Sequence, residues 1–240
     1  MRYLITHRTQ CRYDSPVMVC HYHARLTPRP LPTQQCPWHE ISIHPEPLQR
    51  VVRQDAYGNT MVYFEIEGAH EELEVVARNW VEITPLTPPD AKTTTPWERV
   101  RDACLQENWS SASQAAEFIF ASPLIRCYPS FATYALQDFT PQRPILEAAL
   151  ALNHRIGSDF TFDPTATNAA TPIEEAWEKK RGVCQDYAQI MIACLRSIGL
   201  PARYVSGYLE TQPPPGQEKL VGADASHAWL ALWCLSLIHI

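Results

Sequence analysis

A segment rich in proline and threonine, Thr84 to Pro96 (TPLTPPDAKTTTP), is the feature that most limits how this chain can fold. Proline disrupts helix interiors and central strands, so segments of this composition form stiff linkers between separately folding parts. The residues on the two sides of it also differ in pattern. We therefore expect an N-terminal domain at residues 1–83, a linker at 84–96 and a second domain at 97–234.

The first 83 residues have the pattern of β structure. Apolar residues alternate from Glu72 to Ile83, and the segment Thr60 to Glu67 (TMVYFEIE) is rich in β-branched and aromatic residues. Tyr57-Gly58-Asn59 precedes this segment and is typical of a hairpin turn, because Gly and Asn tolerate positive φ. The pattern predicts a small N-terminal β-sandwich.

The residues after the linker have a helical pattern followed by strands. Pro144 to Ile156 is predicted to form a helix that Gly157 ends. A second helix, Cys184 to Ile198, is apolar around most of its circumference, as expected of a helix at the centre of a domain. Ala202–Leu209 and Ser226–Trp233 read as strands, so the fold class is expected to be α+β.

Composition excludes several classes of function. With 20 Lys+Arg against 26 Asp+Glu in 240 residues, the formal charge is −6, which argues against a protein that binds nucleic acid. No glycine-rich phosphate-binding motif is present. The N-terminus lacks the apolar core of a signal peptide, and Ile190–Leu195 is too short to span a bilayer. We expect a cytoplasmic protein with no nucleic-acid or membrane partner, and with its eight cysteines reduced.

Cys184 and His227 are the candidate catalytic residues. A thiol at the start of a helix is close to unpaired N–H groups that stabilise a thiolate, and a histidine on a neighbouring strand can act as its base. On spacing alone, a buried cysteine and a structural histidine are the better interpretation.

Three blocks of sequence resemble the bacterial transglutaminase-like family, which belongs to the papain-like cysteine enzymes. The blocks are RGVCQDYA at residues 181–188, GLPARYVSGY at residues 199–208 and GADASHAW at residues 222–229. The first half of the chain is similar to the β-rich domain that precedes this core. The resemblance implies a papain-like core in which the nucleophile helix packs on an antiparallel sheet.

The resemblance also implies roles for individual residues. Cys184 matches the nucleophile that becomes a thioester and His227 matches its base, and the Cys184 backbone N–H matches one donor to the oxyanion. No cofactor or metal is implied. A tryptophan donor of the crosslinking enzymes is not matched, because Trp109 is too far from Cys184 along the chain. Asp186 is interpreted either as tuning the thiolate or as capping a backbone N–H.

The end of the chain departs from the family. An orienting Asp is expected about fifteen residues beyond the histidine, but no Asp, Glu, Asn or Gln follows His227, and Asp224 is poorly placed for this role. Residues 235–240 (LSLIHI) resemble the translation of a transposase adapter used in DNA-library preparation, and we interpret them as a sequencing artefact. We therefore expect a truncated and poorly active enzyme.

The expected function is cysteine-dependent acyl transfer on a peptide or protein amide, most simply hydrolysis by a peptidase or amidase. One alternative is protein-glutamine crosslinking, which is disfavoured because it has no clear purpose in a reducing cytoplasm and the indole donor is not matched. A non-catalytic binding module with an incomplete triad is another alternative. Oligomeric state and substrate identity are not predicted.

Residues 20–39 also contain cysteines and histidines, the residue types that bind zinc. His21 and His23 would share one face of a strand while Cys20 faces the other, and the spacing to Cys36 and His39 matches no standard zinc motif. These residues are expected to be ordinary strand residues.

Overall fold

A computed structural model describes residues 1–105, 115–210, 226–234 and 237–239. The chain divides into two compact units, Met1–Pro88 and Pro89–Ile240, and the division falls within the proline- and threonine-rich segment 84–96. Each unit is described by itself.

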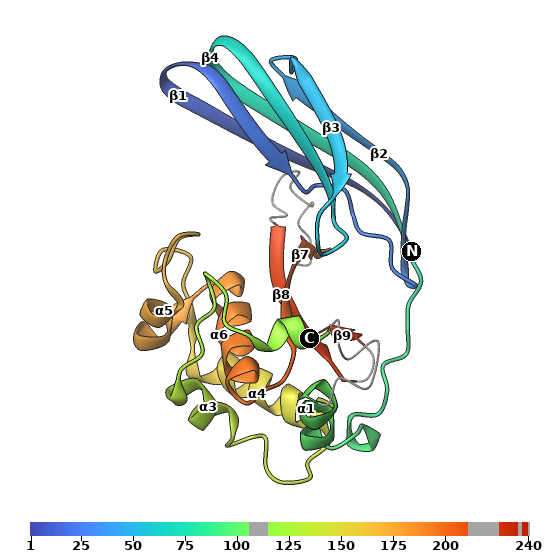
Figure 1. Ribbon diagram of the computed structural model, residues 1–240, viewed down its shortest axis with the longest axis vertical. Helices are drawn as coiled ribbons and strands as arrows, with labels where there is room; N and C mark the ends of the chain where they lie inside the picture. The colour runs from blue at the N-terminus through green and yellow to red at the C-terminus, as the bar shows by residue number, and fades with distance from the viewer. Residues whose placement is uncertain (106–114, 211–225, 235–236, 240) are drawn as a thin grey trace, which may run out of the picture. The chain divides into compact units, whose positions relative to one another are not determined.

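The N-terminal unit is one antiparallel sheet built around a single long strand. β4 (Thr60–Ile83) pairs with β1 (Arg2–Ala24), β2 (Gln34–His44) and β3 (Gln49–Gln54). Figure 1 shows β1 and β4 bending over together part-way along their length. The register of this pair shifts near Val17, and Gly68 has a φ of 101°, so the bend coincides with an irregular stretch of both strands.

The bend allows the two halves of one sheet to share a core. Residues from the first half of β4 and from the second half contribute to the same buried cluster, which comprises Ile41, Val62, Phe64, Ile66, Leu73, Val75 and Ala77. The alternation predicted from Glu72 to Ile83 is present. The layers expected of a sandwich are thus parts of one continuous sheet.

The second unit combines helices with a small antiparallel sheet. Its elements are η1 (Ala91–Thr93), α1 (Trp97–Leu105), η2 (Glu117–Ile119), α3 (Pro129–Ala135), α4 (Ile145–Asp159), β5 (Thr161–Phe162), α5 (Ile173–Lys179), β6 (Arg181–Gly182), α6 (Cys184–Ser197), β7 (Ala202–Tyr208), β8 (Ser226–Trp233) and β9 (Leu237–His239). The strand order is β7-β8-β9, so three of the six residues interpreted as an adapter artefact pair with β8. The α+β class is confirmed.

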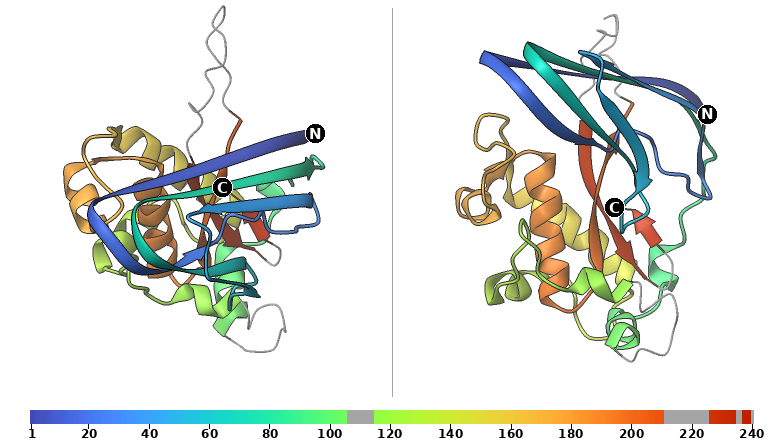
Figure 2. Two further views of the ribbon diagram at one scale, coloured as in Figure 1. Left: turned by 90° about the horizontal axis from the view of Figure 1, so that it is seen from above. Right: turned by 45° about the horizontal axis from the view of Figure 1, so that its top comes forward.

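Helix α6 is the centre of this unit. α3 and α5 lie on one side of it and the β7–β8 pair on the other (Figures 1 and 2). From Ile190 to Leu195 its residues are at most 2% exposed, which confirms the prediction of a central buried helix. The prediction that Gly157 ends α4 was wrong, because the helix continues to Asp159. No described helix has both the length and the apolar character needed to cross a membrane.

Candidate active site

Cys184 is the first residue of α6, directly after the N-cap residue Val183, whose backbone is extended. The first N–H groups of a helix have no partner within it and favour negative charge nearby. Cys184 is partly buried, whereas Cys194 on the same helix is completely buried, and burial raises the pKa of the Cys194 thiol to about 12. Of the two cysteines on α6, Cys184 is the one whose environment suits a nucleophile.

Asp186 caps the first turn of α6. Its Oδ2 accepts a hydrogen bond from the Val183 backbone N–H at 2.8 Å and another from the Thr167 hydroxyl at 2.6 Å. The residue is only 1% exposed, so these donors replace the water that the carboxylate loses on burial. A carboxylate at the third helical position that reaches back to the N-cap N–H holds the residue before Cys184 in place.

Gly182 leaves the space that Asp186 occupies. A Cβ atom at residue 182 would lie 2.4 Å from Asp186 Oδ2 and 2.9 Å from both Asp186 Cβ and Asp186 Cγ. On its other side, Gly182 pairs with Phe162 in the parallel pair of β5 and β6, and its carbonyl accepts the Asp163 N–H at 3.0 Å. A residue with a side chain does not fit between these two neighbours.

His227 is the second residue of β8 and lies opposite Gly207 of β7. Directly opposed residues of an antiparallel pair share a face of the sheet, as do residues two apart along a strand. His227 therefore shares its face with Gly207 and Trp229. The indole of Trp229 lies over Gly207, where a Cβ atom would be 2.5 Å from Trp229 Cη2.

A cavity of about 550 Å³ connects Cys184 with the strand that carries His227. It is formed by the last turns of α4, the first turns of α6 and the three residues of β8 that directly follow His227. The lining residues are Asn153, His154, Ile156, Gly157, Ser158, Cys184, Tyr187, Ala188, Met191, Ala228, Trp229 and Leu230. His227 itself is not one of the described residues that line the cavity. Its immediate neighbour Ala228 is, so the cavity extends from Cys184 to the residue next to His227.

The α4 side of this cavity was not predicted from the sequence. Asn153, His154 and Ser158 give it a polar edge, and all three are exposed. The apolar spacing that predicted α4 says which face is buried but does not say what the opposite face borders.

Two tyrosines lie in the electrostatic surroundings of Cys184. Burial raises the pKa of Tyr204 on β7, and the charges of Cys184 and Asp186 raise it further. Burial and then the Asp186 charge raise the pKa of Tyr187, which lines the cavity. Tyr187 Oη is buried and has no hydrogen-bond partner among the residues described. Both phenols stay protonated at neutral pH and can donate a hydrogen bond; neither was singled out from the sequence.

Two residues considered for catalytic support lie outside the described part of the chain. They are Trp109, considered as a donor to the oxyanion, and Asp224, considered as the group that orients His227. Neither role is assigned from the structure.

The residues considered for a zinc site have separate partners. Cys20 Sγ lies 3.5 Å from His70 Nε2, and His21 Nδ1 lies 2.7 Å from Tyr63 Oη. Cys36 donates to a backbone carbonyl two residues further on. Across residues 1–105 and the other described ranges, no three His, Cys, Asp or Glu side chains are grouped to hold a metal ion.

The chain matches known families over both of its units. Residues 3–82 match the bacterial transglutaminase-like N-terminal region, and residues 133–236 match the core of the transglutaminase-like superfamily. The chain belongs to the transglutaminase-like superfamily. Members of this superfamily are associated with cysteine-dependent acyl transfer. The matched core, residues 133–236, contains both Cys184 and His227.

Relatives of this transglutaminase-like chain are found in several bacteria. An uncharacterized protein of Mycobacterium tuberculosis is 39% identical over 236 residues, which cover 97% of this chain and 73% of the relative. A protein-glutamine gamma-glutamyltransferase of Pseudomonas aeruginosa is 33% identical over 94 residues, 39% of this chain and 14% of the relative.

One solved structure has the same fold. It is a candidate cysteine protease from Cytophaga hutchinsonii, with a TM-score of 0.77 and 16% identity, and the match covers 100% of this chain and 75% of that one. At this identity the likeness concerns the fold.

Proposed function

We propose that this chain hydrolyses amide bonds of peptide or protein substrates through a thioester at Cys184. The observation that carries the proposal is the position of Cys184, which begins a buried helix and lines a cavity shared with the strand of His227. A cavity of this size accommodates a substrate side chain and the amide attached to it.

The reaction uses two side chains in fixed roles. His227 takes the proton of the Cys184 thiol, and Sγ attacks the amide carbonyl carbon to give a tetrahedral oxyanion. The Cys184 backbone N–H donates to this oxyanion. When the C–N bond breaks, His227 gives its proton to the leaving amine, and the thioester remains. Water then loses a proton to His227 and attacks the thioester carbon. When the C–S bond breaks, a carboxylic acid is released and His227 returns the proton to Sγ.

Protein-glutamine crosslinking is the second candidate. It differs in one step, because a primary amine replaces water as the group that attacks the thioester. The named activity of the Pseudomonas aeruginosa relative favours it. Hydrolysis is preferred because the indole donor of the crosslinking enzymes is not matched: Trp109 is too distant in sequence from Cys184.

We also propose that the protein acts in a reducing compartment, the cytoplasm. The cysteines in the described ranges form no disulfide, and they are spread over both units. A protein with this many cysteines outside disulfides keeps its nucleophile available where thiols stay reduced.

The test compares thiol reactivity with turnover in the whole chain. Carbamidomethylation of Cys184 by iodoacetamide at pH 6 is followed by peptide mass spectrometry, with glutathione as the free-thiol reference. Casein is then supplied with a fluorescent primary amine, and both new amino termini and incorporated fluorophore are measured. Cys184→Ser and His227→Ala are the test variants, and Cys127→Ser removes another partly buried thiol as a control.

We expect Cys184 to react faster than glutathione, His227→Ala to abolish this advantage, and new amino termini to exceed incorporated amine. Cys127→Ser should behave as wild type. More incorporated amine than new termini would make the chain a crosslinking enzyme. Equal alkylation of Cys184 and glutathione in wild type and His227→Ala would leave a non-catalytic binding module.

A further inference from the structure

Lys180 has an unusual backbone conformation four residues before Cys184. It follows the last residue of α5 with φ 52° and ψ 37°, in the left-handed region. Glycine is the usual residue at this position after a helix, because a Cβ atom is unfavourable there. A lysine at such a position is expected to make side-chain contacts that glycine could not.

The ammonium group of Lys180 lies in a box of aromatic rings. Nζ is 3.3 Å from the centroid of the Trp177 ring, 4.4 Å from that of Phe160 and 5.4 Å from that of Tyr134. The rings also pack on one another. The centroid of the Trp177 ring lies 5.0 Å from that of Tyr134 and 4.9 Å from that of Phe131, both in edge-to-face contacts. A cation is attracted to the electron-rich faces of such rings, and most strongly when water is excluded. We call these three rings, Trp177, Phe160 and Tyr134, the aromatic box.

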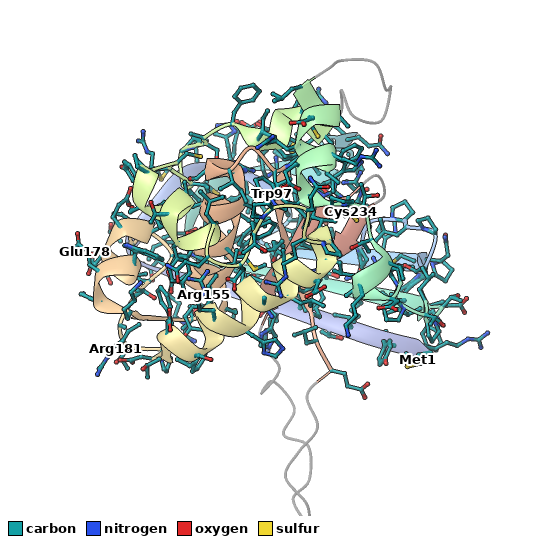
Figure 3. The ribbon with its side chains drawn as sticks, turned by 90° about the horizontal axis from the view of Figure 1, so that it is seen from below. Met1, Trp97, Arg155, Glu178, Arg181 and Cys234 are labelled. Atoms are coloured by element: carbon teal, nitrogen blue, oxygen red, sulfur yellow. The ribbon has the colours of Figure 1, made fainter. Side chains whose placement is uncertain are left out.

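Asp159 and Arg155, which carry opposite charges, both lie beside the aromatic box. Asp159 accepts a hydrogen bond from Tyr134 Oη at 2.7 Å, and its charge acts to raise the pKa of Lys180, although burial lowers that pKa more strongly. Arg155 of α4, labelled in Figure 3, is paired with Asp138, and its guanidinium lies over the Tyr134 ring, 3.8 Å from the ring centroid. The charge of Arg155 acts to lower the pKa of Lys180. Asp159 is thus a carboxylate whose charge favours the Lys180 cation, alongside the aromatic faces.

The aromatic box is connected to Cys184 by a short, firmly held main chain. The backbone N–H groups of β5 and of the residue after it donate to the carbonyls of Lys180 and Gly182 at 2.9 and 3.0 Å. Val183 then donates to Asp186 at 2.8 Å, and Cys184 follows. The aromatic box, the β5 backbone and the Asp186 cap thus hold consecutive parts of the segment 180–183.

We propose that Lys180 is a positioning residue whose ammonium group, seated in the aromatic box, fixes segment 180–183 and through it the place of Cys184. The consequence for reactivity rests on the proposed role of Cys184 as nucleophile. Lys180 acts on that thiol through the main chain and touches no reacting atom.

The test uses three variants of the whole chain. Lys180→Arg keeps the cation, Lys180→Met keeps a long side chain without charge, and Lys180→Gly removes the side chain from a conformation that glycine adopts freely. Hydrogen exchange of the Val183 amide reports whether the segment is held, and the rate of Cys184 alkylation reports the consequence. Thermal unfolding is recorded for each variant to separate these effects from global stability.

We expect Lys180→Met and Lys180→Gly to speed exchange at Val183 and to slow Cys184 alkylation about tenfold, which corresponds to about 1.4 kcal/mol. Lys180→Arg should keep both the exchange rate at Val183 and the alkylation rate of Cys184 close to the wild-type values. Unchanged exchange at Val183 in Lys180→Met and Lys180→Gly would overturn the positioning role. A wild-type alkylation rate equal to that of glutathione, with faster exchange in these variants, would instead overturn the proposed function and support the role of Lys180 in fixing the segment.

Discussion

The substitution Gly182→Ala adds a single methyl group at a place with no room for it. The new Cβ would lie 2.4 Å from Asp186 Oδ2 and 2.9 Å from Asp186 Cβ, whereas real Cβ atoms essentially never come within 3.0 Å of an atom of a residue beyond their immediate chain neighbours. Turning the carboxylate away relieves only part of this overlap, because Asp186 Cβ is held by the backbone of α6. Either the buried carboxylate leaves its site or the first turn of α6 moves away from β6.

The free-energy cost of Gly182→Ala follows from comparing these two responses. Losing both hydrogen bonds of the Asp186 carboxylate would cost about 3–6 kcal/mol, at about 1.5–3 kcal/mol for each bond to a charged group. Moving the helix is an overpacking response, which costs about 1–3 kcal/mol. The less costly response dominates, so we expect a loss of about 2–3 kcal/mol, or roughly 5–10 °C in the unfolding midpoint of the second unit.

Differential scanning calorimetry of the whole chain measures this loss. Gly157→Ala is the matched control, because that glycine lies inside α4 with nothing within 4 Å of the added Cβ. It should stabilise the unit by up to about 1 kcal/mol through helix propensity. Gly182→Ala should also slow Cys184 alkylation. If the free energy of unfolding of Gly182→Ala is within about 0.5 kcal/mol of the wild-type value, the described contact between residue 182 and Asp186 is wrong.

Two further substitutions test the N-terminal unit and the β7–β8 pair. The Arg25 guanidinium, together with the backbone N–H groups of Asn59 and Tyr57, holds the pKa of Asp55 well below its ordinary value of 3.8. Because the folded pKa is the lower one, this stabilisation is complete above the unfolded pKa and is lost progressively as the pH falls from there through the folded pKa. Urea midpoints of wild type should therefore drop below about pH 5, whereas Asp55→Asn should be less stable at pH 7 and lose this part of the pH dependence, and parallel pH curves would contradict the assignment. Gly207→Ala would push the far end of the Trp229 indole, which can turn, so we expect a smaller loss of stability than for Gly182→Ala but a clear change in tryptophan fluorescence and slower amide hydrolysis; unchanged fluorescence and rate would count against the described indole position.

Local patterns in the sequence were sufficient to predict the main elements. Alternation from Glu72 to Ile83 identified one face of β4, and the apolar run after Cys184 identified the central helix. The end of α4 was not predicted correctly, because a glycine inside a helix costs only about 1 kcal/mol and the packing of the preceding turns outweighs it. The bend of β1 and β4 depends on pairing across the chain, which no short window of sequence contains.

The candidate site divides in the same way. The position of Cys184 at a helix start is a local property, so it was predicted. The need for glycine at residue 182 was not predicted, because the atoms that exclude a side chain there belong to Asp186 in the first turn of α6. The aromatic box was not predicted either, since Tyr134, Phe160 and Trp177 come from separate elements and meet only in the folded unit.

The central place of β4 in the N-terminal sheet has a consequence for synthesis. β1, β2 and β3 all pair with β4, and the register joins Arg2 to Glu82. The first three strands therefore leave the ribosome without their partner, and the sheet can close only when residue 83 has emerged. Because these contacts join distant parts of the chain, closure should be slow compared with helix formation in the second unit. A nascent chain that stops before β4 holds three strands whose edges remain open to other chains.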